Sequence, residues 1–174
     1  MREWIEIAEQ CGFTKAAPLR MDTLKPMPMV RDACASNTCR AYGSNWTCPP
    51  FCGTLEECDE KMQRYSNGIL LQTVGKLEKQ IDTKGYARVE REHLSHLNSF
   101  AEIIRRDYPD ALCLGAGGCR VCKTCVFPEP CRFPQKAISS MEAYGLFVTQ
   151  VCRDNGMNYY YGPMTIAYSA CVLF

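Results

Sequence analysis

The residues of this chain most able to do chemistry are its cysteines, of which there are thirteen among 174 residues. The densest run reads C-x2-C-x2-C-x5-C and begins at Cys119. This spacing brings three thiolates around one small volume, where backbone amides can hydrogen-bond inorganic sulfide. We expect the run to bind a [4Fe–4S]-type cluster, with mononuclear zinc or buried free thiols as alternatives. Its four cysteines are Cys119, Cys122, Cys125 and Cys131.

A second group of cysteines lies earlier, in a segment with almost no aliphatic side chains. Its members are Cys34, Cys39, Cys48 and Cys52, with Pro49 and Pro50 between the last two. A zinc ribbon would show two C-x2-C pairs, which this segment lacks. Because the segment cannot bury a hydrophobic core, we expect a metal to hold its shape. A second iron–sulfur cluster and a zinc ion are both open as the occupant.

The remaining cysteines fall on apolar faces of the expected helices and strands, where a thiol behaves as a small hydrophobic group. We expect packing roles for all five: Cys11, Cys58, Cys113, Cys152 and Cys171. His93 and His96 share one face of an expected helix. Because they lack a third ligand, a solvated or core-edge role is favoured over metal binding.

Four cations crowd the C-x2-C-x2-C run: Arg120, Lys123, Arg132 and Lys136. A four-thiolate cluster carries net negative charge, so cations beside it offset that charge and raise its potential. We therefore expect Arg120, Lys123 and Arg132 to lie beside the cofactor. A generic basic surface is the alternative.

The elements that must position these residues follow from hydrophobic spacing and capping signals. Helices are expected over residues 2–11, 54–65, 85–108 and 139–154, the second and fourth opening with capping boxes. Strands are expected over 68–74, 111–114 and 164–174, and residues 13–29 form a loop or a short edge strand. This order predicts one α/β or α+β domain over residues 1–174, with a small mixed sheet and a long helix. Two cysteine-rich metal-binding loops, at about 34–58 and 113–134, would pack at one end. Two metal lobes with little sheet between them are the alternative.

Composition narrows the possible functions. Twenty basic and nineteen acidic residues give a net charge of +1, which offers no electrostatic reason for a nucleic-acid or anionic-membrane partner. No stretch approaches the ~18 apolar residues of a membrane-spanning helix. The mixed, charged N-terminus is unlike a secretory signal, so we expect a cytoplasmic protein. In a reducing compartment, thiols more often hold metal or do redox chemistry than form structural disulfides.

With both cysteine groups in view, the chain resembles a cysteine-rich family of predicted metal-binding proteins of unknown function from anaerobic bacteria and archaea. The resemblance rests on Cys34, on residues 39–50 (CRAYGSNWTCPP), on residues 118–134 and on residues 140–145 (SMEAYG). It implies metal binding, with an iron–sulfur cluster favoured, and it implies no particular reaction.

Three function classes remain. The first is a redox or electron-transfer accessory protein, because ligation by four cysteines leaves no open iron. The second is an enzyme whose cluster keeps an open iron, for which the place to look is the 34–58 group beside Tyr42, Asn45 and Trp46. The third is a zinc-stapled interaction module. No motif binds a nucleotide or flavin, so electrons would come from an acidic partner such as a ferredoxin or flavodoxin, docked on the cations near the C-x2-C-x2-C run.

Overall fold

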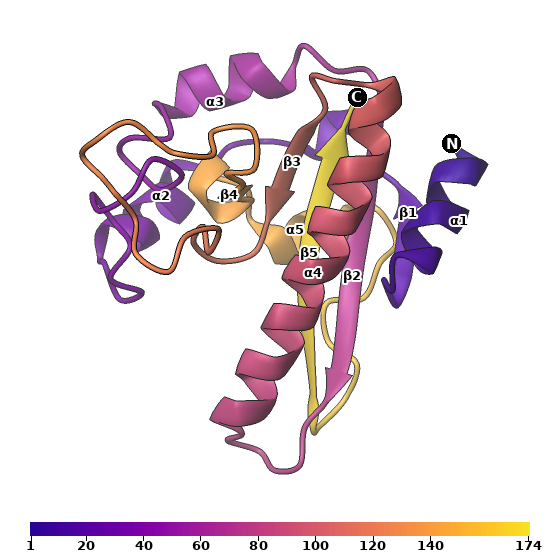
Figure 1. Cartoon of the computed structure of the whole chain (residues 1–174). Helices are drawn as coiled ribbons and strands as arrows, with labels where there is room; N and C mark the ends of the chain where they lie inside the picture. Colours follow the sequence, from indigo (N-terminus) through magenta and orange to yellow (C-terminus); the bar gives the residue numbers. More distant parts are fainter.

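A computed structural model describes all residues, 1–174. Its centre is a five-stranded sheet with the strand order β1-β2-β5-β3-β4 (Figure 1). The two nine-residue strands β2 (Gly68–Lys76) and β5 (Thr165–Leu173) pair antiparallel along their whole length. The flanking strands are β1 (Lys15–Pro18), β3 (Leu112–Gly115) and β4 (Ser139–Ser140), and β4 runs parallel to β3. The sheet is therefore mixed, as expected, and β1 is the edge strand predicted within residues 13–29.

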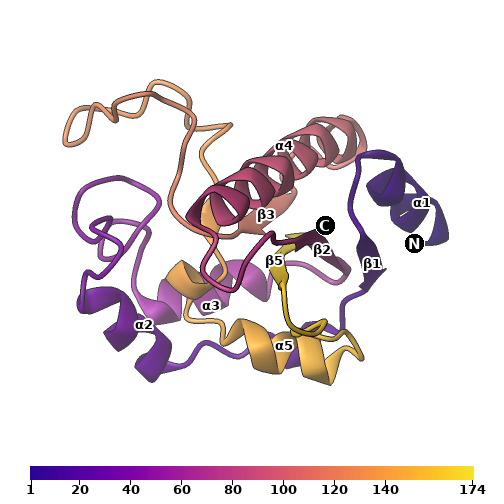
Figure 2. The ribbon, with the colours of Figure 1, turned by 90° about the horizontal axis from the view of Figure 1, so that it is seen from below.

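Helices cover both faces of the sheet, and the fold is of the α+β class (Figure 2). They are α1 (Arg2–Gln10), α2 (Pro28–Ala35), α3 (Leu55–Met62), α4 (Thr83–Asp107) and α5 (Val148–Asp154), with 3-10 turns η1 (Met21–Thr23) and η2 (Glu142–Tyr144). Alternate residues of β2 enter different cores: Ile69 packs with α1 and α4, whereas Leu70 packs with α3 and α5. Because the central strands are buried on both faces, they read as nearly continuous apolar runs.

The long helix α4 confirms the prediction for residues 85–108. It begins two residues earlier than expected, because the Asp82 carboxylate accepts a hydrogen bond from Gly85 N at 2.9 Å and caps the helix. It ends at Asp107, and its C-cap Tyr108 directly precedes Pro109, whose ring cannot continue a helix.

One predicted capping box is confirmed and the other is wrong. At α3, Glu57 N donates to Thr54 Oγ1 at 3.2 Å, and Thr54 N donates to Glu57 Oε2 at 2.7 Å. Ser139, the expected cap of the last helix, instead pairs with Leu114 in the sheet, and α5 begins only at Val148. Sheet pairing and the left-handed Gly145 (φ 76°) override the local capping pattern. Helix α2 was not expected at all.

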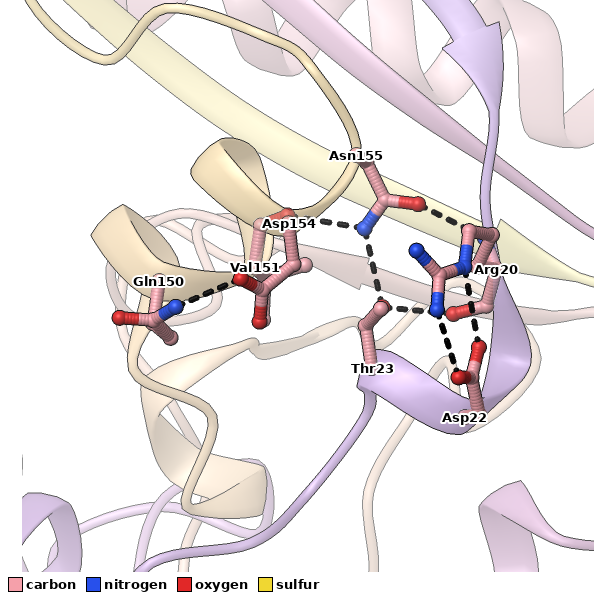
Figure 3. Close-up of polar contacts among 7 residues, drawn as sticks. All are labelled: Arg20, Asp22, Thr23, Gln150, Val151, Asp154 and Asn155. Carbon is pink, nitrogen blue, oxygen red and sulfur yellow. Dashed lines mark hydrogen bonds and ion pairs between the residues drawn. The ribbon is translucent and has the colours of Figure 1, made fainter.

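Asn155 ends α5, as the sequence predicts, and ties this helix to the η1 segment (Figure 3). Its side-chain Oδ1 accepts a hydrogen bond from Arg20 N at 2.8 Å. Its Nδ2 donates to Thr23 Oγ1 at 2.9 Å and to Val151 O at 2.8 Å. Two segments far apart in sequence, residues 20–23 and 151–155, are thereby joined.

Most cysteines of the two groups lie in the segment between α2 and α3 and in the segment that follows β3. Residues 36–53 and 116–138 form two irregular loops, which lie on the side of the molecule opposite to α1 (Figures 1 and 2). We call them the first and the second cysteine loop. None of the helices combines the length and the apolar character needed to cross a membrane.

Candidate metal centre

Three cysteines of the first group line one pocket of about 230 Å³. Cys34 belongs to the last turn of α2, and Cys39 and Cys48 follow in the first cysteine loop. Burial raises the pKa of the Cys34 and Cys48 thiols. The second cysteine loop supplies Gly117 and Gly118 to the same wall. We call this cavity the three-cysteine pocket.

Local hydrogen bonds fold the first cysteine loop around this pocket. Asn37, in the left-handed region at φ 54°, accepts a hydrogen bond from Tyr42 N through Oδ1 at 3.0 Å. Gly43 N donates to Pro49 O at 2.8 Å, which closes the loop between Cys39 and Cys48. Short polar side chains and turns thus replace the hydrophobic core that this segment lacks.

The second cysteine loop passes directly over the pocket. A Cβ atom placed on Gly118 would lie 3.7 Å from Ala41 Cβ and 3.9 Å from Cys48 Sγ, so the backbone at Gly118 lies close to the Cys48 sulfur. No backbone N–H from Gly117 to Val126 donates to a backbone carbonyl. These amides are available for other acceptors, including the sulfur atoms of a bound cluster.

The four cysteines of the C-x2-C-x2-C run are spread along this loop. Cys119, Cys122 and Cys131 are half-buried, and Cys125 is exposed. Cys119 lines a different pocket, of about 480 Å³, between the glycines and α4. In the structure no three histidine, cysteine, aspartate or glutamate side chains are gathered closely enough to hold one metal ion. Ligation by this run stays a prediction.

Cys52 lies outside the three-cysteine pocket and beside Cys58 instead. Cys52 Sγ donates to Ala143 O at 3.5 Å, and Cys58 Sγ accepts a hydrogen bond from Arg31 Nη2 at 3.3 Å. The neighbouring Cys52 side chain and the Arg31 guanidinium lower the pKa of Cys58. Cys58 is buried in the core as expected, but its contact with Arg31 was missed because α2, which carries Arg31, was not predicted.

The other cysteines pack as expected. Cys113, Cys152 and Cys171 are buried in the cores on the two faces of the sheet, and Cys11 is half-buried beside α1. Burial raises the pKa of Cys113 to about 11. These thiols are accordingly protonated at neutral pH and behave as small hydrophobic groups.

Aromatic side chains join the two cysteine loops. Trp46 of the first loop packs against Phe127 of the second, with ring centroids 5.0 Å apart, and against Phe51 at 5.8 Å. Trp46 Nε1 also donates to Glu129 O at 2.9 Å. We call this set the aromatic junction. It fixes the second loop against the first without any metal bond.

The cations near the C-x2-C-x2-C run differ in their surroundings. Arg120 Nη2 lies 2.8 Å from Glu90 Oε1 of α4, and Glu90 is only 19% exposed. Lys123, Arg132 and Lys136 are exposed and take part in no ion pair. Charge compensation and partner docking both stay predictions for these three side chains.

Glu142 was not predicted as a site residue: its segment was interpreted as a helix cap, although residues 140–145 belong to the motif that carries the family resemblance. In the structure Glu142 lines the three-cysteine pocket, and burial raises the pKa of its carboxyl group. Cys34 Sγ also lies 3.9 Å from the backbone oxygen of Glu142. Thiols and carboxyl groups are donor types that zinc and iron bind, but these four are not gathered around a single point.

The chain belongs to the family described as "Predicted metal-binding protein (DUF2284)", whose model matches residues 17–174. The match spans every cysteine except Cys11. It confirms the resemblance stated from the cysteine motifs and makes this chain a member of a cysteine-rich, predicted metal-binding family. No curated protein and no solved structure matches the chain.

Proposed function

We propose that this protein binds iron–sulfur clusters in its two cysteine loops and serves as a one-electron relay. The observation that supports this most is the convergence of the two loops. Cys34, Cys39 and Cys48 surround one pocket, whose wall is completed by Gly117 and Gly118 directly before the C-x2-C-x2-C run. The loop that carries the second cysteine group thus contributes two glycines to the pocket formed by the first group.

The geometry of the pocket favours a cluster over a single zinc ion. A zinc ion needs thiolates at ~2.3 Å from one point, and no three donor side chains are gathered in that way. In a cubane each thiolate binds a different iron atom, so the ligands stand farther apart around a larger volume. A cavity of about 230 Å³ with thiols spread around its wall suits that arrangement. The unpaired amides of residues 117–126 add hydrogen-bond donors for sulfide.

A bound cluster would supply one-electron chemistry. The protein residues would bind the cluster and guide an electron carrier to it. Cys119, Cys122, Cys125 and Cys131 would bind one cluster, with no iron left open. Lys123, Arg132 and Lys136 would guide an acidic electron carrier of the ferredoxin or flavodoxin type to this face. That reduced carrier donates one electron, and one electron leaves to an acceptor protein in each cycle.

A second candidate function is an enzyme with an open metal position. It is favoured by one observation: the three-cysteine pocket offers only three thiols, and Tyr42 lies in its wall. A phenol beside an incompletely ligated metal could donate a hydrogen bond to a bound substrate. Visible-spectrum changes on adding small oxygen- or nitrogen-donor ligands would favour this candidate over the relay.

Charge reversal tests the relay separately from metal binding. The double variant Lys123→Glu and Lys136→Glu should keep its bound iron and accept electrons more slowly from an acidic ferredoxin, with the difference from wild type shrinking at high salt. Reversal at Lys15, an exposed cation on β1, is the matched control. An unchanged rate with intact clusters would overturn docking on this face.

A further inference from the structure

Glu142 is the one acidic side chain in the wall of the three-cysteine pocket. The segment that carries it is held from two sides. Met141 N donates to Gly115 O at 2.9 Å, and Arg31 Nε donates to Ala143 O at 2.8 Å. The residues before and after Glu142 are therefore bonded to the start of the second cysteine loop and to α2, so Glu142 cannot easily leave the pocket.

No cation compensates this carboxyl group. Glu142 takes part in none of the ion pairs of the structure. The backbone oxygen of Glu142 lies 3.9 Å from Cys34 Sγ, so this residue borders the pocket directly beside one of its thiols. Arg31, on the same helix as Cys34, directs its guanidinium to Gly53 O and Cys58 Sγ as well as to Ala143 O. A carboxylate that is partly withdrawn from water and has no ion-pair partner is stabilised when a cation binds beside it.

The neighbouring cysteines do not complete the thiol set of the pocket. Cys119 lines the cavity on the α4 side of the glycines, and Cys52 Sγ is hydrogen-bonded to Ala143 O. The wall therefore contains three thiols and one carboxyl group. Three thiolates and one carboxylate carry the same total charge as four thiolates, so the set can neutralise a cluster equally well.

We propose that Glu142 is the fourth, oxygen-donating ligand of the metal centre held by Cys34, Cys39 and Cys48. The inference rests on the proposed metal function of the pocket. A hard carboxylate binds a thiophilic iron less firmly than a thiolate does. Glu142 is therefore the ligand that a small oxygen donor, such as a carboxylate or a phosphate, would displace most readily from its metal atom.

The test compares Glu142→Gln and Glu142→Cys with wild type, and Glu129→Gln, in the exposed part of the second cysteine loop, is the matched control. Mössbauer spectra of anaerobically prepared, iron-enriched protein should show in wild type and in the control an iron site of oxygen ligation. Glu142→Cys should lose this signal while it keeps its iron, and Glu142→Gln should lose iron from the pocket. Circular dichroism checks that each variant is folded.

Spectra of Glu142→Cys and Glu142→Gln that both equal wild type would overturn the role of Glu142 and leave the proposed cluster function standing. Wild-type protein that contains zinc alone would overturn the cluster function. Zinc X-ray absorption then decides the ligand question, because a thiolate-and-oxygen shell that becomes all-sulfur in Glu142→Cys supports the inference. Wild-type protein that binds no metal would overturn both.

Discussion

The aromatic junction yields the sharpest quantitative prediction, for the substitution Trp46→Ala. The Trp46 side chain donates a hydrogen bond to Glu129 O and packs against Phe51 and Phe127. None of these residues belongs to the hydrophobic cores on the two faces of the sheet. The substitution should therefore release the second cysteine loop from the first while the sheet and the helices stay intact.

The expected magnitude follows from three interactions. A neutral hydrogen bond contributes about 0.5–1.5 kcal/mol net, and each aromatic pair contributes about 0.5–1.5 kcal/mol. Because Trp46 is 36% exposed, the lower half of each range applies. The sum is about 2 kcal/mol, which corresponds to a loss of about 30-fold in the affinity for a metal centre that needs both loops in place.

Metal retention against a chelator measures this loss, and hydrogen exchange of the amides of residues 117–126 reports the release of the loop directly. Trp46→Phe keeps the ring contacts and loses only the hydrogen bond, so its loss should be about threefold. Tyr160→Ala removes an exposed aromatic side chain elsewhere and is the matched control. Wild-type metal retention in Trp46→Ala would refute the view that this junction holds the two loops together.

Three further predictions concern the fold. Burial lowers the pKa of His93 from 6.5 to about 4, so the unfolded chain binds a proton that the folded chain does not. The free energy of unfolding should therefore fall by about 2 kcal/mol from pH 7 to pH 5, and urea titrations with equal values at both pH values would contradict this. Thr54→Ala removes the cap of α3 and should lower the free energy of unfolding by about 1 kcal/mol, whereas Thr54→Ser should not. A Cβ at Gly75 would overlap the Val89 side chain of α4, so Gly75→Ala should destabilise by about 1–3 kcal/mol, with partial recovery in a Val89→Ala background.

Much of the fold could be predicted because its signals are local. Residues close together in the sequence form each of these signals. Examples are the capping box at Thr54, the helical spacing before Tyr108 and the apolar runs of β2 and β5. The error at Ser139 shows the limit of such signals. A serine with a glutamate three residues later favours a helix start, but pairing with Leu114 offers this segment more hydrogen bonds within the sheet.

The sequence predicts which types of residue form the candidate site, but it predicts only in part which of those residues lie together. Spacing along the chain assigned Cys52 to the same metal as Cys48, whereas the structure places Cys52 with Cys58 and Arg31. Spacing also treated the two cysteine loops separately, because contacts such as that between Gly118 and Cys48 depend on the sheet that carries them. A pattern of cysteines cannot reveal a carboxyl group such as that of Glu142, which we propose as a fourth ligand.

The most direct test of the central claim is the metal content of protein purified without oxygen. If the cysteine loops bind iron–sulfur clusters, the wild-type protein is brown, absorbs broadly across the visible range and contains iron together with acid-labile sulfide. Cys48→Ser should lower both contents, and Cys11→Ser, a half-buried thiol beside α1, should leave them at the wild-type level. A colourless wild-type protein that contains zinc and no sulfide would contradict the account.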